Sequence, residues 1–403
     1  DAVTAANAFV AGATPTQTNT YNNGKIDVPA KPSAIVTVTK DNVQQALIDS
    51  GYYQASDFTG LGAAPAAPAG KAAVGVVLPT KDEPRWLQDQ AVFQKAGFEP
   101  LFSQGDSAKE MANVEALISQ GVKVIIITPQ DATAAAAAAE AAKAAGVKVI
   151  SYDRLIRDTD AVDYYVTFDS MAVGAAWSQY LIEQAGDTKG NPLYLYAGAA
   201  SDNNAFIFFE GAWEKIQPKI ADGTFVIKNS SEATALQDKL ELTRDELAKI
   251  IGQVTTNWDF NTAKGLAESN LTVAKPEDKG TVFILAPNDG TARAIADVFG
   301  ADKDVTSYVV TGQDAEIPSV QYIIDGKQSM TVMKDVRTLA ADAVTAANAF
   351  VAGATPTQTN SYNNGKIDVP AKPSAIVTVT KDNVKQALID SGYYQASDFT
   401  GLP

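Results

Sequence analysis

The chain has 403 residues, of which 46% are hydrophobic and 20% charged, a composition typical of a globular protein too long for one ordinary domain. Its formal net charge of −15 argues against nucleic acid or an anionic membrane surface as a partner, because both require clustered Lys and Arg. It contains neither Cys nor His, which excludes disulfides, thiolate nucleophiles, Ser-His-Asp triads and the commonest zinc ligands. We therefore expect no metal and no cofactor.

The N-terminus repeats a segment found again at the C-terminus. Residues 1–61 recur at 342–402, and only two positions differ: Thr20 against Ser361, and Gln44 against Lys385. Residues 62–70 are rich in Ala, Pro and Gly and predict a semi-rigid linker. The chain is thus a body at 71–403 preceded by an extra copy of its own C-terminal segment. A piece of a tandem array, an engineered or permuted chain and a natural partial duplication all fit this pattern.

The body alternates predicted strands and helices in chain order. Apolar, β-branched runs predict strands at 72–78, 121–128, 147–152, 192–196, 281–285, 307–310 and 329–333. Helical patterns lie between them, at 131–145, 204–220 and 291–298 and in a segment that ends before Gly97. Such alternation predicts parallel βαβ units, and about ten strands exceed one modest sheet. The predicted fold class is α/β, with two doubly wound parallel-sheet lobes.

Polar side chains and two tryptophans follow these strands or lie in adjacent loops. They are Arg85, Trp86, Asp153, Arg154, Asp202, Asn204, Asn288, Asp314 and Lys334, with Trp258 in the loop before a helix at 262. Ligands of doubly wound sheets bind beyond the carboxyl ends of the strands, so we expect these side chains to surround one site.

A sugar is the ligand that this mixture fits. Each hydroxyl donates one hydrogen bond and accepts two, and carboxylates beside Arg, Lys and Asn can satisfy all of them. The apolar faces of a pyranose ring need flat cover, which Trp supplies. Taken singly, each feature is more often a surface ion pair, a helix cap, a turn or core packing. Their joint position at consecutive strand ends is what favours a binding site.

The body resembles the periplasmic sugar-binding proteins of ABC transporters with the type I, ribose/galactose-like fold, in the xylose and multiple-monosaccharide branch. The stretches that carry the resemblance are residues 85–86, 152–156, 165–169, 202–205, 312–316 and 333–334. It implies sugar contacts at Arg85, Asp153, Arg154, Asp202, Asn204, Asn288, Asp314 and Lys334, and aromatic cover by Trp86 and Trp258.

The resemblance also implies a domain plan and partners. Lobe one would comprise about 71–167 plus 335–365, and lobe two 168–333 plus 372–403, joined by a three-stranded hinge at 167, 334 and 366–372. Closure on a monosaccharide such as xylose, glucose or galactose would signal to an ABC permease, with a chemoreceptor or sensor kinase as a further partner. The location would be the periplasm, or the outer surface of the membrane with an anchor, after removal of a signal peptide.

The repeat contains a predicted helix at 2–10 (like 343–351), the third crossing and the tail of lobe two. One body has one place for this segment. We hypothesise that one copy completes the fold, while the other is surplus or exchanges with a neighbouring molecule.

Three other functions compete with a receptor. A carbohydrate-active enzyme could use Asp153 and Asp202 as a carboxylate pair, but nearby cations and amides favour their ionised forms, so we expect no enzyme. A transcription regulator needs a basic helix-turn-helix in front of the body, where the extra copy stands instead. An engineered or domain-swapped sugar-binding scaffold or sensor is the main alternative, and the choice among the monosaccharides stays open.

Overall fold

The computed structural model describes residues 19–22, 25–30 and 73–402. The chain divides into two units, residues 1–70 and residues 71–403. In the first unit, β1 (Asn19–Asn22) and β2 (Asp27–Ala30) pair as an antiparallel hairpin. The helix predicted at 2–10 and the linker predicted at 62–70 lie outside the described residues.

The body contains a seven-stranded sheet in the order β13-β14-β7-β6-β5-β3-β4. Its strands pair in parallel, except that β13 is antiparallel to β14. The strands are β3 (Val74–Leu78), β4 (Leu101–Phe102), β5 (Val124–Ile127), β6 (Lys148–Tyr152), β7 (Tyr164–Phe168), β13 (Asn360–Asn363) and β14 (Asp368–Ser374).

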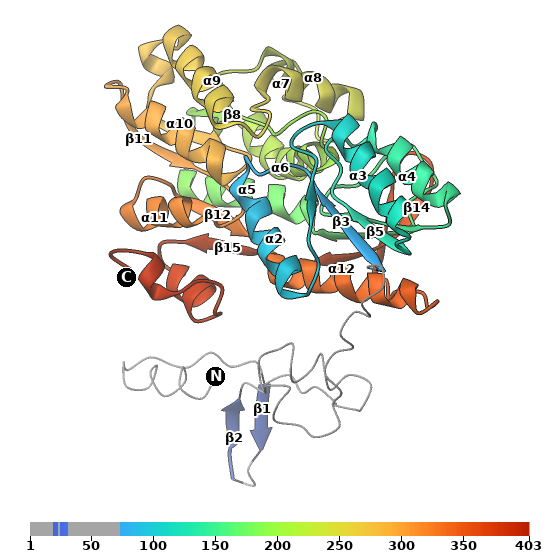
Figure 1. Ribbon diagram of the computed structural model, residues 1–403. Helices are drawn as coiled ribbons and strands as arrows, with labels where there is room; N and C mark the ends of the chain where they lie inside the picture. The colour runs from blue at the N-terminus through green and yellow to red at the C-terminus, as the bar shows by residue number, and fades with distance from the viewer. Residues whose placement is uncertain (1–18, 23–24, 31–72, 403) are drawn as a thin grey trace. The chain divides into compact units, whose positions relative to one another are not determined.

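Helices cover both faces of this sheet because its strands are apolar on both sides (Figure 1). In β5, Ile125 and Ile127 pack with the helices on one face, whereas Val124 and Ile126 pack on the other. The first face carries α3 (Ser107–Gln120) and α4 (Ala135–Ala144). The second carries α2 (Pro84–Lys95) and α12 (Val336–Val351).

A second sheet of four parallel strands has the order β11-β10-β8-β9. Its strands are β8 (Asn191–Leu195), β9 (Phe225–Ile227), β10 (Gly280–Leu285) and β11 (Val305–Val310). The helices around it are α5 (Ser170–Ala185), α6 (Asn203–Ala221), α7 (Ser231–Ala235), α8 (Arg244–Val254), α9 (Phe260–Val273), α10 (Asp289–Ala301) and α11 (Ile317–Asp325), with the 3₁₀ turn η3 (Pro276–Asp278) before β10. The two sheets are the centres of the two predicted lobes, so the α/β fold class is confirmed.

Glycine allows α5 and α6 to approach closely. A Cβ atom on Gly174 would lie 1.8 Å from the backbone oxygen of Phe208, and one on Gly211 would lie 2.2 Å from that of Met171. Both distances are far below van der Waals contact, so a side chain at either position would force the helices apart.

The predicted strand at 329–333 does not belong to a parallel sheet. β12 (Met330–Met333) pairs antiparallel with β15 (Val377–Thr380), although Val332 forms one parallel bridge to Gln313. β12 lies outside the parallel sheets because its pairing partner, β15, comes from the C-terminal segment and runs in the opposite direction. The segment ends with the short helical turns η4 (Lys385–Ile389) and η5 (Ala396–Asp398).

The chain passes between the two sheets at three places. The first two lie between β7 and α5 and between β12 and α12, near the predicted residues 167 and 334. The third lies at 375–376, between β14 and β15, rather than at 366–372. This prediction was a few residues too early, because Lys372 and Ser374 still pair with Val166 and Phe168 of β7.

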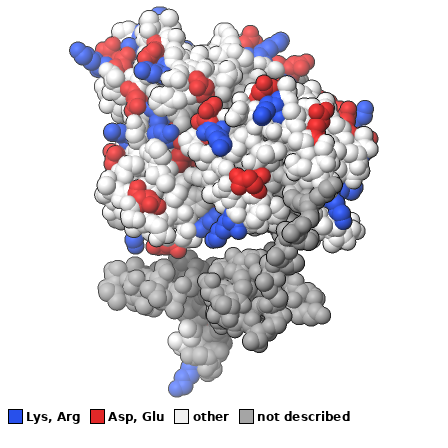
Figure 2. Space-filling view, viewed as in Figure 1, with Lys and Arg blue, Asp and Glu red and all other residues white. Residues whose placement is uncertain are grey.

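The surface shown in Figure 2 carries Lys and Arg interspersed with Asp and Glu over the body. This face has no continuous basic area of the kind that binds nucleic acid. Among the described helices, none is both long and apolar enough to span a bilayer.

Glu110 of α3 gives the body a specific dependence of stability on pH. Its side chain is buried and accepts a 2.7 Å hydrogen bond from the backbone N–H of Gln130, and burial raises its pKa to about 7. The folded chain therefore keeps a proton that the unfolded chain releases near pH 4.5, so the free energy of unfolding falls as the pH rises from 4.5 to 7.

We expect Glu110→Gln, which keeps the acceptor but cannot ionise, to remove about 2 to 3 kcal/mol of the stability difference between pH 5 and pH 8. Urea unfolding of both proteins at the two pH values measures this. An identical pH dependence in the wild type and the variant would contradict it.

Candidate functional site

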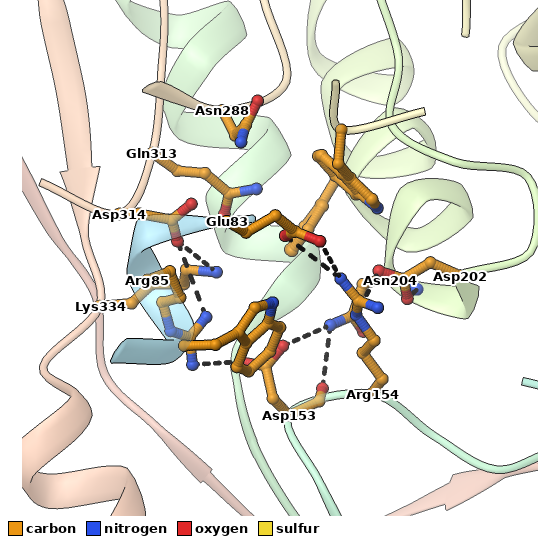
Figure 3. Close-up of a pocket in the computed structure, with 13 residues that line it drawn as sticks. Glu83, Arg85, Asp153, Arg154, Asp202, Asn204, Asn288, Gln313, Asp314 and Lys334 are labelled. Carbon is orange, nitrogen blue, oxygen red and sulfur yellow. Dashed lines mark hydrogen bonds and ion pairs between the residues drawn. The ribbon is translucent and has the colours of Figure 1, made fainter. Parts of the chain in front are cut away.

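The ten predicted side chains surround one small hollow between the two sheets (Figure 3). They follow the carboxyl ends of strands, either in loops or in the first turn of the next helix: Arg85 and Trp86 after β3, Asp153 and Arg154 after β6, Asp202 and Asn204 after β8, Asn288 after β10, Asp314 after β11, Lys334 after β12, and Trp258 between α8 and α9. Glu83, Phe208 and Gln313 complete the lining. The expected meeting of these residues thus occurs; their contact with a sugar stays a prediction.

Arg85 is held by carboxylates from both lobes. It lies in the first turn of α2, where Pro84 begins the helix, and its Nε donates to Asp89 at 3.0 Å, one turn further along. Its Nη2 donates to Asp153 at 2.9 Å, and its Nη1 lies 3.7 Å from Asp314. Burial works against the charged guanidinium, but the three carboxylates outweigh burial and raise the pKa of Arg85. Arg85 is therefore a fixed cation at the floor of the site.

Arg154 plays a matching part on the other side of the hollow. Its Nε forms an ion pair with Asp202 at 2.8 Å, and its Nη2 lies 3.4 Å from Glu83. Its guanidinium also lies 5.0 Å from the ring centre of Trp86, within cation–π range. Burial raises the pKa values of Asp202 and Glu83, and the nearby Arg154 opposes both shifts.

A left-handed turn at Asp153 turns two adjacent side chains into the hollow. Asp153 has φ of 62°, a conformation that Asp adopts more readily than most residues. Its carbonyl accepts hydrogen bonds from the Tyr165 hydroxyl at 2.7 Å, Thr167 Oγ1 at 3.2 Å and Asn204 Nδ2 at 2.9 Å. Successive residues of a regular strand face opposite ways, so this turn is what lets Asp153 and Arg154 act together.

The electrostatics of Asp153 keep it ionised. Burial alone would raise its pKa, but the charges of Arg85 and Lys334 outweigh burial and lower the pKa below its usual value. Such a carboxylate accepts hydrogen bonds and does not serve as a proton donor near neutral pH.

Asp314 and Lys334 form the third pair. Lys334 Nζ lies 2.9 Å from Asp314 Oδ1, and Asp314 has φ of 95°. This strained turn is held from behind by Asp289, a fully buried residue that accepts from the N–H of Glu316 at 2.9 Å and from Gln328 Nε2 at 2.8 Å. Burial, together with the nearby Glu316, raises the pKa of Asp289 well above its usual value.

The two indoles differ in how they are fixed. Trp86 belongs to α2 and is buried in the core between that helix and the first sheet. Trp258 packs against Gly198, where an added Cβ would come within 2.0 Å of the indole ring. Phe208 meets Trp258 edge to face, with ring centres 6.4 Å apart. In the described part of the chain, Trp258 Nε1 and Gln313 Oε1 are buried without a hydrogen-bond partner. Buried polar atoms of this kind usually bond to a ligand or to water.

The lining carries four carboxylates and three cations, which leaves it close to electrically neutral. Burial raises the pKa of Glu83, so the one surplus carboxylate is also among those easiest to protonate. A neutral site of paired charges suits an uncharged ligand with many hydroxyls better than an ionic one.

Four contributors escaped the sequence prediction: Glu83, Gln313, Phe208 and Asp89. Glu83 and Gln313 lie in strand-end segments that also hold predicted residues, so their position was a usable signal. Phe208 sits on an apolar helix face and Asp89 behind Arg85, and neither place is visible in the sequence.

Comparison with known proteins agrees with this geometry. Residues 74–355 match a family described as periplasmic binding protein domain. The multiple sugar-binding periplasmic receptor ChvE of Rhizobium radiobacter is 36% identical over 83% of this chain and 94% of its own length. The D-xylose-binding periplasmic protein of Escherichia coli K12 is 28% identical, with the same coverage.

Solved structures show the same similarity. A carbohydrate transporter solute-binding protein from Chloroflexus aurantiacus, in complex with D-glucose, is 74% identical with a TM-score of 0.81; the match covers 82% of this chain and 99% of that one. An ABC transporter solute-binding protein from Clostridium phytofermentans, with bound β-D-glucose, is 32% identical with a TM-score of 0.72, covering 81% and 99%.

Asp89 gives a test of how the site is held. It bonds both Arg85 and the Tyr152 hydroxyl (2.5 Å), and all three groups are buried. We expect Asp89→Asn to lower the free energy of unfolding by about 3 kcal/mol, because Arg85 loses a buried counter-charge. Tyr152→Phe, the matched control, removes one hydrogen bond to the same carboxylate but keeps its charge, and should cost about 1.5 kcal/mol. Equal losses in urea unfolding would show that Asp89 acts as an ordinary hydrogen-bond acceptor.

Proposed function

The chain belongs to the family described as periplasmic binding protein domain, and from that premise we propose that it is a solute-binding receptor for a monosaccharide. The ligand is an uncharged pyranose, with D-glucose first among the candidates and xylose and galactose next. The receptor captures it between the two lobes and delivers it to an ABC permease.

The observation that carries the proposal is the set of charge pairs around the hollow. The pairs are Arg85 with Asp153, Arg154 with Asp202 and Lys334 with Asp314, and each places carboxyl oxygens beside a guanidinium or amino N–H donor. A sugar hydroxyl bridging such a pair donates to the carboxylate and accepts from the cation at once. Hydrogen bonds to charged groups contribute about 1.5 to 3 kcal/mol each, so a few bridged hydroxyls suffice for micromolar affinity.

Aromatic cover supports the same ligand. Trp258 and Phe208 line the hollow on the side of the second sheet, and Trp86 lies on the side of the first. Flat rings cover the C–H faces of a pyranose at little entropic cost. A free Trp258 N–H is also available to a hydroxyl at the edge of the ring.

Contacts between the lobes support capture by closure. The Ala132 N–H donates to the Ser201 carbonyl at 2.9 Å, and Asn204 Nδ2 donates to the Asp153 carbonyl at 2.9 Å. We propose lobes of about 71–168 plus 335–374 and 170–333 plus 377–403, close to the boundaries predicted from sequence. A ligand that contacts both lobes shifts the equilibrium toward the closed form, to the extent that its affinity for the closed form exceeds its affinity for the open form. The permease recognises the closed form.

The properties of the carboxylates in the site favour a receptor over an enzyme. The lowered pKa of Asp153 deprives a hydrolase of its general acid at this position, and Asp202 is tied to Arg154 and to the N–H of Asn204 at 2.8 Å. We therefore propose that the sugar leaves unchanged. We propose that the protein works in the periplasm, or anchored outside the cell membrane, after removal of a signal peptide. A chemoreceptor or sensor kinase would be its second partner.

Calorimetric titration tests the ligand. We expect D-glucose to bind with a dissociation constant in the micromolar range or below. Ribose and arabinose should bind at least tenfold more weakly, because each lacks the hydroxymethyl group of glucose and also orients a ring hydroxyl differently. Asp153→Ala should weaken glucose binding at least tenfold. The exposed Asp160→Ala is its control and should leave binding unchanged. No heat of binding with any monosaccharide would refute the proposed function.

Two variants of Trp258 distinguish stacking of its ring on the sugar from hydrogen bonding by its N–H. We expect Trp258→Ala to weaken glucose binding about tenfold or more, through loss of the flat surface. Trp258→Phe keeps a flat ring without the N–H and should recover most of this loss. If both variants bind glucose with the same weakened affinity, the contribution of Trp258 comes from its indole N–H. If Trp258→Ala binds glucose normally, Trp258 is not part of the binding site.

A further inference from the structure

Two short strands in the extra N-terminal copy, β1 and β2, pair like β13 and the start of β14 in the C-terminal copy. In the first unit Asn19 pairs with Ala30 and Asn22 with Asp27. In the body Asn360 pairs with Ala371 and Asn363 with Asp368, which is the same register at the repeated positions. Between residues 19 and 30 the sequences differ only at Thr20, which corresponds to Ser361. The chain therefore contains two equivalent hairpins, 19–30 and 360–371.

The C-terminal hairpin is built into the first sheet along the edge of β7. Ala371 of β14 pairs in parallel with Tyr165, and Val369 is fully buried in the core. The Tyr362 ring packs edge to face on Tyr165, with centres 5.5 Å apart. Asn364, in the turn, donates to the carbonyls of Ile156 at 3.1 Å and Thr159 at 2.8 Å. We call this surface, formed by β7 and these two carbonyls, the β7 edge.

The N-terminal hairpin exposes what its counterpart buries. Val28, the equivalent of Val369, is 38% exposed, and Tyr21, the equivalent of Tyr362, is 56% exposed. In the part of the chain that the structure describes, β1 and β2 form a two-stranded sheet, whereas β14 pairs with both β13 and β7. The hairpin thus exposes two apolar side chains whose complementary surface is known, because the β7 edge fits the equivalent residues in the body.

We propose that the hairpin of residues 19–30 binds the β7 edge of a second copy of this chain whenever that copy's residues 360–371 are displaced from it. Both hairpins offer the same side chains, so an exchange between two molecules replaces each lost contact with an equivalent one. An intact C-terminal copy, already attached to its body, holds the edge at low concentration. A damaged C-terminal copy yields the edge to the N-terminal hairpin of a neighbour.

The repeat supplies matched variants for the test. The variant that we call the C-terminal pair combines Tyr362→Asp with Val369→Asp and places unpaired charge at the β7 edge. The variant that we call the N-terminal pair combines Tyr21→Asp with Val28→Asp and makes the same change in the extra copy. Both are made in the full chain, singly and combined. Light scattering measures the mass, and circular dichroism follows thermal unfolding, so the readouts do not depend on sugar binding. Deletion of residues 1–70 in the wild type and in the C-terminal pair provides the control.

The proposal predicts a dimer only where exchange is needed. The wild type, the N-terminal pair and the wild type without residues 1–70 should be monomers with the same unfolding midpoint. The C-terminal pair should have the mass of two chains or more and one cooperative transition within about 10 °C of the wild type. The combined variant, and the C-terminal pair without residues 1–70, should show no cooperative transition.

Three results would overturn the proposal. A C-terminal pair that unfolds as fully as the combined variant would show that the N-terminal hairpin cannot replace its counterpart. A folded but monomeric C-terminal pair would place the hairpin on its own body instead of a second copy. A combined variant as stable as the C-terminal pair would show that residues 19–30 contribute nothing at the β7 edge.

Discussion

Compensation of buried charge between the two lobes is the constraint on which the site depends. Arg85 and Arg154 are buried cations, and each is paired with carboxylates that come from different strand ends. An unpaired ion at these depths would cost several kcal/mol, so the lobes cannot present this chemistry unless they meet in register. The same pairs leave the site nearly neutral and rich in charged hydrogen-bonding groups. A polyol can use such groups, whereas an ionic ligand would disturb the balance.

The backbone keeps these pairs in position at some cost in strain. Asp153 and Asp314 both have positive φ, and each is secured from outside the hollow: the first through its carbonyl, the second through the network around Asp289. Asp89 does the same for the side chain of Arg85. The residues that would touch the ligand therefore rest on a second layer of buried polar groups, and preorganisation of this kind reduces the entropy lost on binding.

Periodicity and strand-end chemistry predicted the fold class and the meeting of ten side chains, because parallel strands place their carboxyl ends at one edge of a sheet. They failed where a long-range return decided the pairing. β12 looked like another parallel strand, but β15 pairs with it from the C-terminal segment, and the last crossing shifted to 375–376 because β14 continues along β7. Asp89 and Asp289 hold site residues in place through buried hydrogen bonds, and no local sequence pattern predicts such contacts. The repeat was evident at once, yet only the contacts of Val369 and Tyr362 show which surface its second copy could use.

Equilibrium dialysis of the full chain against D-glucose, followed by chromatography of the ligand released on denaturation, tests the central claim most directly. If the paired charges bind a neutral sugar without reaction, we expect saturation at one glucose molecule per chain and recovery of unaltered glucose. Failure to retain the sugar, or recovery of a chemically changed product, would contradict the account.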